Sequence, residues 1–87
     1  MSTFNGKIST SGKMHSVEVD VQKLKSLRRL KVLSMRELEA LSGVSYNTIW
    51  RLETGRTAEA RPRSIRALAS ALEVEPHELL KGSGEDA

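Results

Sequence analysis

The fold of this chain is decided by the stretch SMRELEALSGVSYNTIWRLETGR, residues 34–56. It reads as a short helix, a tight turn at Gly43 and a second short helix that ends at Gly55. Two helices joined by a turn of about three or four residues form the minimal scaffold that presents one helix to the major groove of DNA. We therefore expect the second helix, residues 45–54, to carry the working surface.

The first of these helices has clear boundary signals in the sequence. Ser34 followed by Glu37 matches a capping box, in which each side chain satisfies a backbone N–H of the first turn. Leu38 and Leu41 are predicted to form the buried face of this helix. Gly43 supplies the left-handed backbone by which the chain leaves the helix.

The second helix is predicted to have a buried face and an exposed face. Ser45 is its expected N-cap, and Ile49 and Leu52 are expected to face the core. Asparagine can pair bidentately with adenine, and arginine with guanine or a phosphate. Two aromatic residues four positions apart either contact thymine methyl groups and the sugar-phosphate wall, or pack on each other and stiffen the helix. The residues with these binding possibilities lie on the exposed face of the helix: Tyr46, Asn47, Trp50 and Arg51.

Apolar periodicity on either side of this stretch predicts three further helices. One runs from residue 21 or 22 to 31, and another starts at Pro62, where the missing N–H costs nothing. A fifth helix of one or two turns is expected near Pro76. The apolar stripes of the three helices are Leu24, Leu27 and Leu30; Ile65, Leu68, Ala69 and Leu72; and Leu79 and Leu80. The sequence thus predicts an all-α, five-helix domain over residues 21–81.

The two ends of the chain differ from this helical middle. Residues 1–20 are predicted to form a flexible N-terminal arm, because residues 1–13 are rich in Ser, Thr and Gly and hold few apolar side chains. Val17, Val19 and Val21 alternate with polar residues, which indicates a short strand over 14–21. No partner strand is visible within the chain, so this strand either pairs with a second copy or is an extended linker. Residues 82–87 are predicted to form an acidic, disordered tail.

Composition and motifs weigh against several classes of function. The 87 residues contain no cysteine and only two histidines, 62 positions apart, so we expect neither disulfides nor a metal site. No apolar run approaches the roughly 18 residues of a membrane span. The N-terminus lacks the apolar region of a signal peptide, so a cytoplasmic protein is expected. The segment from Gly6 to Met14 has the wrong spacing for a phosphate-binding loop, and no catalytic set can be assembled. We expect neither an enzyme nor a cofactor.

The net charge of +3 is unevenly distributed along the chain. Residues 21–72 carry eleven lysines and arginines against four glutamates, whereas residues 73–87 carry one lysine against five acidic residues. A basic middle with an acidic tail is typical of a protein that binds a polyanion. A merely solvated charged surface would have the same composition.

One set of residues matches a known family in a single register. The set consists of Leu27, Arg28, Leu33, Ser34, Leu38, Leu41, Ser42, Gly43, Val44, Ser45, Thr48, Ile49, Leu52, Glu53, Gly55, Arg56, Pro62, Leu68, Ala69, Ala71, Leu72 and Val74. Through it, residues 24–80 resemble a lambda-repressor-like helix-turn-helix domain of the XRE family, the five-helix DNA-binding module of phage repressors and many bacterial regulators. The resemblance covers about two-thirds of the chain, without gaps up to Gly55.

This resemblance implies roles for the matching positions. Arg28 and Glu53 match a structural ion pair that, in the family, links the first helix to the end of the third. Trp50 joins the expected contact residues because of its place beside Tyr46 on the exposed face. The positions that the resemblance places at phosphates and bases are Ser45, Tyr46, Asn47 and Arg51 in the helix, and Arg56, Arg61 and Arg63 in the loop that follows.

Three positions depart from the family pattern. Met35 stands where many relatives have a glutamine that touches a phosphate, so that contact is expected to be lost. Glu39 stands where the family prefers a small alanine packed against the third helix, which leaves the local packing open. Val32 stands where relatives often have glycine after the first helix. Because a β-branched residue resists the left-handed conformation, a different turn is expected there.

These observations predict a sequence-specific, double-stranded DNA-binding transcriptional regulator, acting as a repressor, that reads the major groove with the helix over 45–54. One small domain buries only roughly 600–1,000 Å² on DNA, so a homodimer on a two-fold-related site is expected. The first alternative is a protein-interaction module with the same fold, such as an antitoxin or adaptor. The second is the DNA-binding part of a recombination or plasmid-maintenance system. The salt dependence of duplex binding separates DNA binding from protein interaction.

Overall fold

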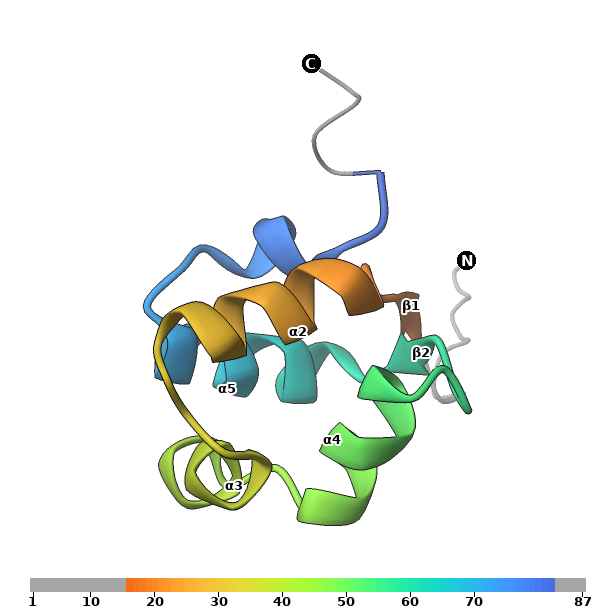
Figure 1. The fold of residues 1–87 in the computed structure, drawn as a ribbon. Coiled ribbons are helices and arrows are strands. Elements are labelled where there is room, and N and C mark those ends of the chain that lie inside the picture. Colours follow the sequence, from red (N-terminus) through yellow and green to blue (C-terminus); the bar gives the residue numbers. More distant parts are fainter. Residues whose placement is uncertain (1–15, 83–87) are drawn as a thin grey trace, which may run out of the picture.

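A computed structural model describes residues 16–82 of the chain. The predicted arm up to residue 15 and the predicted tail from residue 83 lie outside the described residues. The elements follow in the order β1 Val17–Glu18, α2 Val21–Leu30, α3 Met35–Ser42, α4 Tyr46–Glu53, β2 Glu59–Ala60, α5 Pro62–Leu72 and the 3₁₀ turn η2 Pro76–Leu79 (Figure 1). None of the helices within residues 16–82 is long and apolar enough to cross a membrane.

The helices surround one apolar core. α5 packs against α3 and η2, α3 packs against α4, and α2 packs against α4 and η2. Because every α-helix contributes at least one fully buried leucine or isoleucine, removing any of them would open the core to water. The core side chains with no exposed surface are Leu24, Leu38, Ile49, Leu52, Leu68, Leu72 and Leu79.

The expected helix boundaries of the central stretch are confirmed. The Ser34 hydroxyl accepts from the backbone N–H of Glu37 (3.0 Å), and the Glu37 carboxylate accepts from the N–H of Ser34 (2.8 Å). Gly43 ends α3 in the left-handed region, with φ of 80°. Ser45 caps α4 by accepting from the N–H of Thr48 (3.2 Å). These local interactions fix where α3 begins and ends and where α4 begins, and therefore the turn between the two helices.

The prediction of an unpaired strand was wrong. β1 pairs with β2 in an antiparallel two-stranded sheet, with Val17 opposite Ala60 and Glu18 opposite Glu59. Val19 continues the pairing through a bridge to Leu80, and its side chain is buried in the core. Residues 17–20 therefore belong to the packed domain and not to an arm. The partner strand lies in the loop between α4 and α5, where two residues are too few to produce a periodic signal.

The fifth predicted helix lies where it was expected, but it is a 3₁₀ turn and not an α-helix. Residues 76–79 form a single 3₁₀ turn, in which the N–H of Glu78 donates to the carbonyl of Glu75 and that of Leu80 to the carbonyl of His77. Such short segments close with hydrogen bonds three residues apart because too few residues remain to establish an α-helical ladder. The described fold therefore has four α-helices, one 3₁₀ turn and a small sheet.

Two leucines expected in the core are exposed instead. Leu30 is 77% exposed at the last residue of α2, and Leu41 is 60% exposed near the end of α3. On α3 the inward position after Leu38 is Ser42, four residues on, so Leu41 faces away from α4 and α5. The apolar stripes of α2 and α3 are thus narrower than the leucine spacing indicated.

The turn after α2 keeps the left-handed conformation that was expected to change. Val32 has a φ of 57° although it is β-branched, and its side chain is 85% exposed. The N–H of Leu33 donates back to the carbonyl of Arg28 (3.1 Å), which closes the end of the helix. The surrounding hydrogen bonds therefore hold Val32 in a conformation that its own side chain disfavours.

Candidate nucleic-acid interface

A buried ion pair fixes the end of α4 to α2. Arg28 Nε lies 2.6 Å from Glu53 Oε2, and Arg28 Nη2 lies 2.8 Å from Glu53 Oε1, so the guanidinium holds the carboxylate with two parallel hydrogen bonds. The Glu53 side chain is 1% exposed and that of Arg28 is 12% exposed. The hydrogen bond to Glu53 raises the pKa of the Arg28 guanidinium above its ordinary value, although burial acts in the opposite direction. The buried carboxylate of Glu53 thus faces the guanidinium of Arg28 directly.

The same arginine also supports the turn between α2 and α3. Its Nη1 atom donates to the carbonyl of Leu33 at 2.6 Å, directly after the left-handed Val32. A single side chain thus connects three segments: α2, the turn that follows it, and the last residue of α4. The position of α4 is consequently coupled to the part of the fold that carries α3.

With Glu53 held inward, α4 presents a defined outer face. Ile49, Leu52 and Glu53 are buried, whereas Asn47 and Arg51 are exposed. Asn47 and Arg51 lie four residues apart, so they stand one above the other on the helix surface. The two side chains are therefore exposed together on the outer face of α4.

The two aromatic residues of α4 are half-buried and each lies beneath an arginine. The guanidinium carbon of Arg36 lies 4.2 Å from the ring centroid of Tyr46, and that of Arg56 lies 4.9 Å from the ring centroid of Trp50. These distances are typical of cation–π contacts. The rings of the predicted exposed stripe are therefore only partly exposed, because arginines from α3 and from the loop after α4 lie over them.

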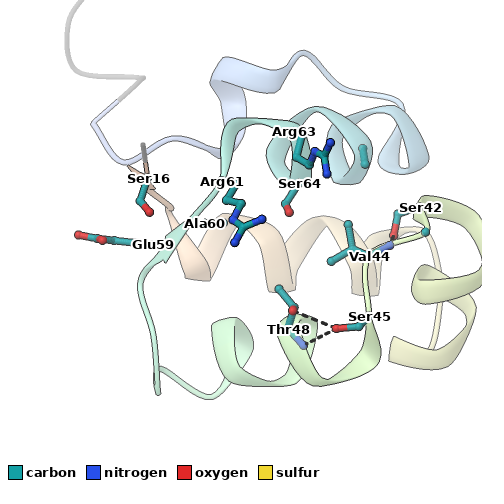
Figure 2. Close-up of a pocket in the computed structure, with 12 residues that line it drawn as sticks. Ser16, Ser42, Val44, Ser45, Thr48, Glu59, Ala60, Arg61, Arg63 and Ser64 are labelled. Carbon is teal, nitrogen blue, oxygen red and sulfur yellow. Dashed lines mark hydrogen bonds between the residues drawn. The ribbon is translucent and has the colours of Figure 1, made fainter. Parts of the chain in front are cut away.

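A groove lies between the N-terminal ends of α4 and α5 (Figure 2). Its volume is about 530 Å³, and it is lined mainly by hydroxyl groups and arginines, with Glu59 at its edge. On the α4 side the Ser45 hydroxyl donates to Thr48 Oγ1 (3.0 Å), and on the α5 side Arg61 extends into the space between the helices. Its polar lining is Ser16, Ser42, Ser45, Thr48, Glu59, Arg61, Arg63 and Ser64.

The beginning of α5 is suited to an anion. Arg61 is its N-cap residue, Pro62 follows in the first turn, and within the described part of the chain no side chain caps this helix. The N-terminus of a helix carries a partial positive charge, and here two exposed arginines, Arg61 and Arg63, add to it. The groove therefore combines hydroxyl donors, guanidinium groups and a helix terminus, which is a chemistry that binds phosphate.

The structure divides the predicted site residues into two groups. Ser45, Arg61 and Arg63 come together at the groove. The remaining five do not line it, and they lie on α4 and in the loop that follows: Tyr46, Asn47, Trp50, Arg51 and Arg56.

Sequence reasoning missed Arg36 above Tyr46 and four hydroxyl residues of the groove, which are Ser16, Ser42, Thr48 and Ser64. For Thr48 a signal existed, because it lies three residues after the N-cap Ser45, where a side chain can return to the cap. The position of Arg36 depends on how α3 meets α4, which the sequence does not contain. Among residues 16–82 no group of His, Asp and Glu side chains is arranged to hold a metal ion.

Comparison with known families and structures is consistent with this geometry. A family model described as "Helix-turn-helix domain" matches residues 21–81. The crystal structure of the restriction-modification controller protein C.AhdI from Aeromonas hydrophila is similar, with a TM-score of 0.63 and 37% identity over 69% of this chain and 89% of that one. An HTH_3 family transcriptional regulator from Vibrio cholerae has a TM-score of 0.61 and 28% identity, over 67% of this chain and 32% of that one.

Two curated proteins of Bacillus subtilis (strain 168) are also similar to this chain. The HTH-type transcriptional repressor RghR is 37% identical over 57 residues, which cover 66% of this chain and 42% of RghR. The HTH-type transcriptional regulator RghRB is 35% identical over 63 residues, which cover 72% of this chain and 45% of RghRB. The matched segment thus spans less than half the length of each of these relatives.

Proposed function

Because the chain belongs to the helix-turn-helix domain family, we propose that it is a sequence-specific, double-stranded DNA-binding transcriptional regulator whose α4 enters the major groove. The observation that carries this proposal is the two-sided character of α4. Its inner face is fixed by the buried Arg28–Glu53 pair, and its outer face presents Asn47 and Arg51 beside a phosphate-binding groove. A rigid helix with free hydrogen-bonding side chains next to a backbone anchor is what major-groove recognition requires.

In this proposal the groove between α4 and α5 positions the protein on the DNA backbone. Arg61 and Arg63 contact phosphates and fix the register without reading sequence, and the Ser45 hydroxyl, which caps α4, lies on the opposite side of the groove. Arg56, stacked on Trp50, contributes a further phosphate contact from the adjacent loop. These contacts account for affinity, and the affinity depends on salt because each phosphate that is neutralised releases counterions.

Sequence is read by the outer face of α4. Asn47 pairs with adenine and Arg51 with guanine, each contact discriminating against a wrong base by roughly 1–3 kcal/mol. The half-exposed edges of Tyr46 and Trp50 contact thymine methyl groups or the sugar-phosphate wall. Occupation of a promoter by such a domain blocks transcription, and the repressor name of RghR supports this mode of action.

Two copies are proposed to bind a two-fold-related site. A single domain buries only roughly 600–1,000 Å² on DNA, which limits its discrimination among genomic sites, and two half-sites about one helical turn apart remedy this. The proposed dimer does not use β1 as an intermolecular strand, because β2 already pairs with it inside the chain. An interface near the α5–η2 end is the arrangement we favour.

Duplex binding as a function of salt tests the proposal. Affinity for duplex DNA is expected to fall steeply with salt, with a log–log slope of about −0.9 per phosphate contacted. Arg61→Ala and Arg63→Ala are expected to weaken binding to all sequences and to flatten this slope. The matched control is Arg66→Ala, because Arg66 is exposed on α5 but does not line the groove.

Absence of duplex binding at about 50 mM salt would contradict the proposal and favour a protein-interaction module. Equal effects of the Arg61, Arg63 and Arg66 substitutions would show instead that binding follows net charge and that the groove has no special part in it.

A further inference from the structure

Glu39 on α3 makes a hydrogen bond to α4, although the family pattern has a small alanine at this position. Its Oε2 atom accepts a hydrogen bond from the backbone N–H of Tyr46, the first residue of α4, at 3.1 Å. Its Oε1 atom lies 3.5 Å from Nη1 of Arg36, the arginine that covers the Tyr46 ring. Glu39 thus joins α3 to the first turn of α4 through the backbone, and through Arg36 to the side chain of the same residue.

This contact places an anion of the protein itself at the positive end of α4. Ser45 satisfies the N–H of Thr48, and the Glu39 carboxylate satisfies the N–H of Tyr46. Free N–H groups and the helix dipole would otherwise make this end of α4 attractive to a phosphate. With Glu39 in place, a phosphate that approaches Tyr46 meets a carboxylate and must displace it.

The two helix N-termini of the interface therefore differ in charge. The beginning of α5 has Arg61 and Arg63 and no side-chain cap among the described residues. At the beginning of α4 the Glu39 carboxylate accepts from the backbone N–H of Tyr46 and also forms an ion pair with Arg36. A DNA backbone is drawn to the first of these ends and repelled from the second.

We propose that Glu39 is a specificity-determining positioning residue, which keeps DNA phosphates away from the N-terminus of α4 and so reduces binding that is independent of sequence. The inference rests on the proposed function, since it concerns how the same interface meets DNA. Its consequence is that the backbone is held at the α5 groove, so that Asn47 and Arg51 meet the bases in one register.

The test compares Glu39→Gln with Glu75→Gln. The first change removes the charge but keeps an oxygen that can accept from Tyr46, so the fold is retained. The second removes the same charge from an exposed residue at the start of η2, an element that packs against α5 and α2 and has no substantial contact with α4. Affinity is measured for a random-sequence duplex and for the preferred site, each over a range of salt concentrations.

Glu39→Gln is expected to raise affinity for the random duplex several-fold more than Glu75→Gln does. Its salt slope should become steeper by about 0.9, corresponding to one additional phosphate contact. The ratio of preferred-site to random-duplex affinity should fall. Glu39→Ala frees the Tyr46 N–H entirely, so it should change the random-duplex affinity, the salt slope and the affinity ratio further in the same directions. Thermal unfolding of each variant verifies that it is folded.

Equal slopes and equal affinity ratios for Glu39→Gln and Glu75→Gln would overturn the inference while leaving the proposed function intact. A loss of affinity of Glu39→Gln for both duplexes would overturn it as well, because the residue would then support binding. Failure of the parent protein to bind any duplex would instead refute the proposed function, and the inference with it.

Discussion

Replacing Arg28 by alanine is expected to destabilise the fold more than any change on the outer face of α4. Arg28 makes three hydrogen bonds, two to the Glu53 carboxylate and one to the carbonyl of Leu33. The Glu53 side chain is 1% exposed, so after Arg28→Ala its charge cannot reach water without opening the core. The left-handed turn at Val32 loses its support at the same time.

The magnitude follows from the burial of the carboxylate. Removing one partner of a buried ion pair costs about 3–5 kcal/mol, because the remaining charge is uncompensated. A domain of this size has a total stability of roughly 5–15 kcal/mol, and each 1 kcal/mol shifts its melting temperature by about 4–8 °C. Arg28→Ala should therefore lower the melting temperature by about 12 °C or more.

Thermal and urea unfolding at pH 7, followed by circular dichroism, measure this effect. The matched control is Arg29→Ala, which removes the same charge from an exposed neighbour and should change stability by no more than about 0.5 kcal/mol. Arg28→Lys keeps the charge but loses the two-pronged geometry, so an intermediate loss is expected. The double variant Arg28→Met/Glu53→Leu should recover much of the stability. If Arg28→Ala melted like Arg29→Ala, the ion pair would contribute nothing and the reasoning would be refuted.

Three further predictions concern the turn after α2, the stability at acidic pH and the contact between Arg56 and Trp50. Val32→Gly should raise the free energy of unfolding, measured in urea, by about 1 kcal/mol, because glycine adopts the left-handed conformation without strain. A decrease in the free energy of unfolding would show that Val32 is not strained. The hydrogen bond from Lys31 lowers the pKa of Glu73, so the pair stabilises the fold above the ordinary pKa of 4.5 and this stabilisation is lost as pH falls through the lowered pKa. Glu73→Gln should therefore reduce the pH dependence of the unfolding free energy below about pH 4.5. An unchanged pH dependence in that range would argue against the contact. Trp50 is the single tryptophan, so its fluorescence should change when the protein binds duplex DNA and when Arg56 is replaced by alanine. Identical emission spectra for the free protein, the DNA complex and the Arg56→Ala variant would contradict the stacking.

Features that depend on a few neighbouring residues could be predicted from the sequence. The capping box of Ser34 and Glu37, the left-handed Gly43 and the cap at Ser45 were all identified, because each depends on contacts within about one helical turn. The buried stripe of α5 was also predicted correctly, since its four apolar residues repeat with the helical period and all face the core.

Features that depend on distant residues could not be predicted in the same way. The pairing of β1 with β2 joins residues more than forty positions apart through a strand of two residues. The exposure of Leu30 and Leu41 depends on which side of each helix meets its neighbours, which leucine spacing does not encode. At the interface, the Glu39–Tyr46 hydrogen bond requires the angle between α3 and α4 to be known.

Selection of bound fragments from random duplex DNA tests the central claim, that α4 reads sequence in the major groove, most directly. The parent protein should enrich one short motif. The double variant Asn47→Ala/Arg51→Ala should still bind duplex DNA through the α4–α5 groove but lose the preference at the positions those two side chains contact, at roughly 1–3 kcal/mol per contact. Enrichment of the same motif with equal strength by the parent and the double variant would contradict the claim.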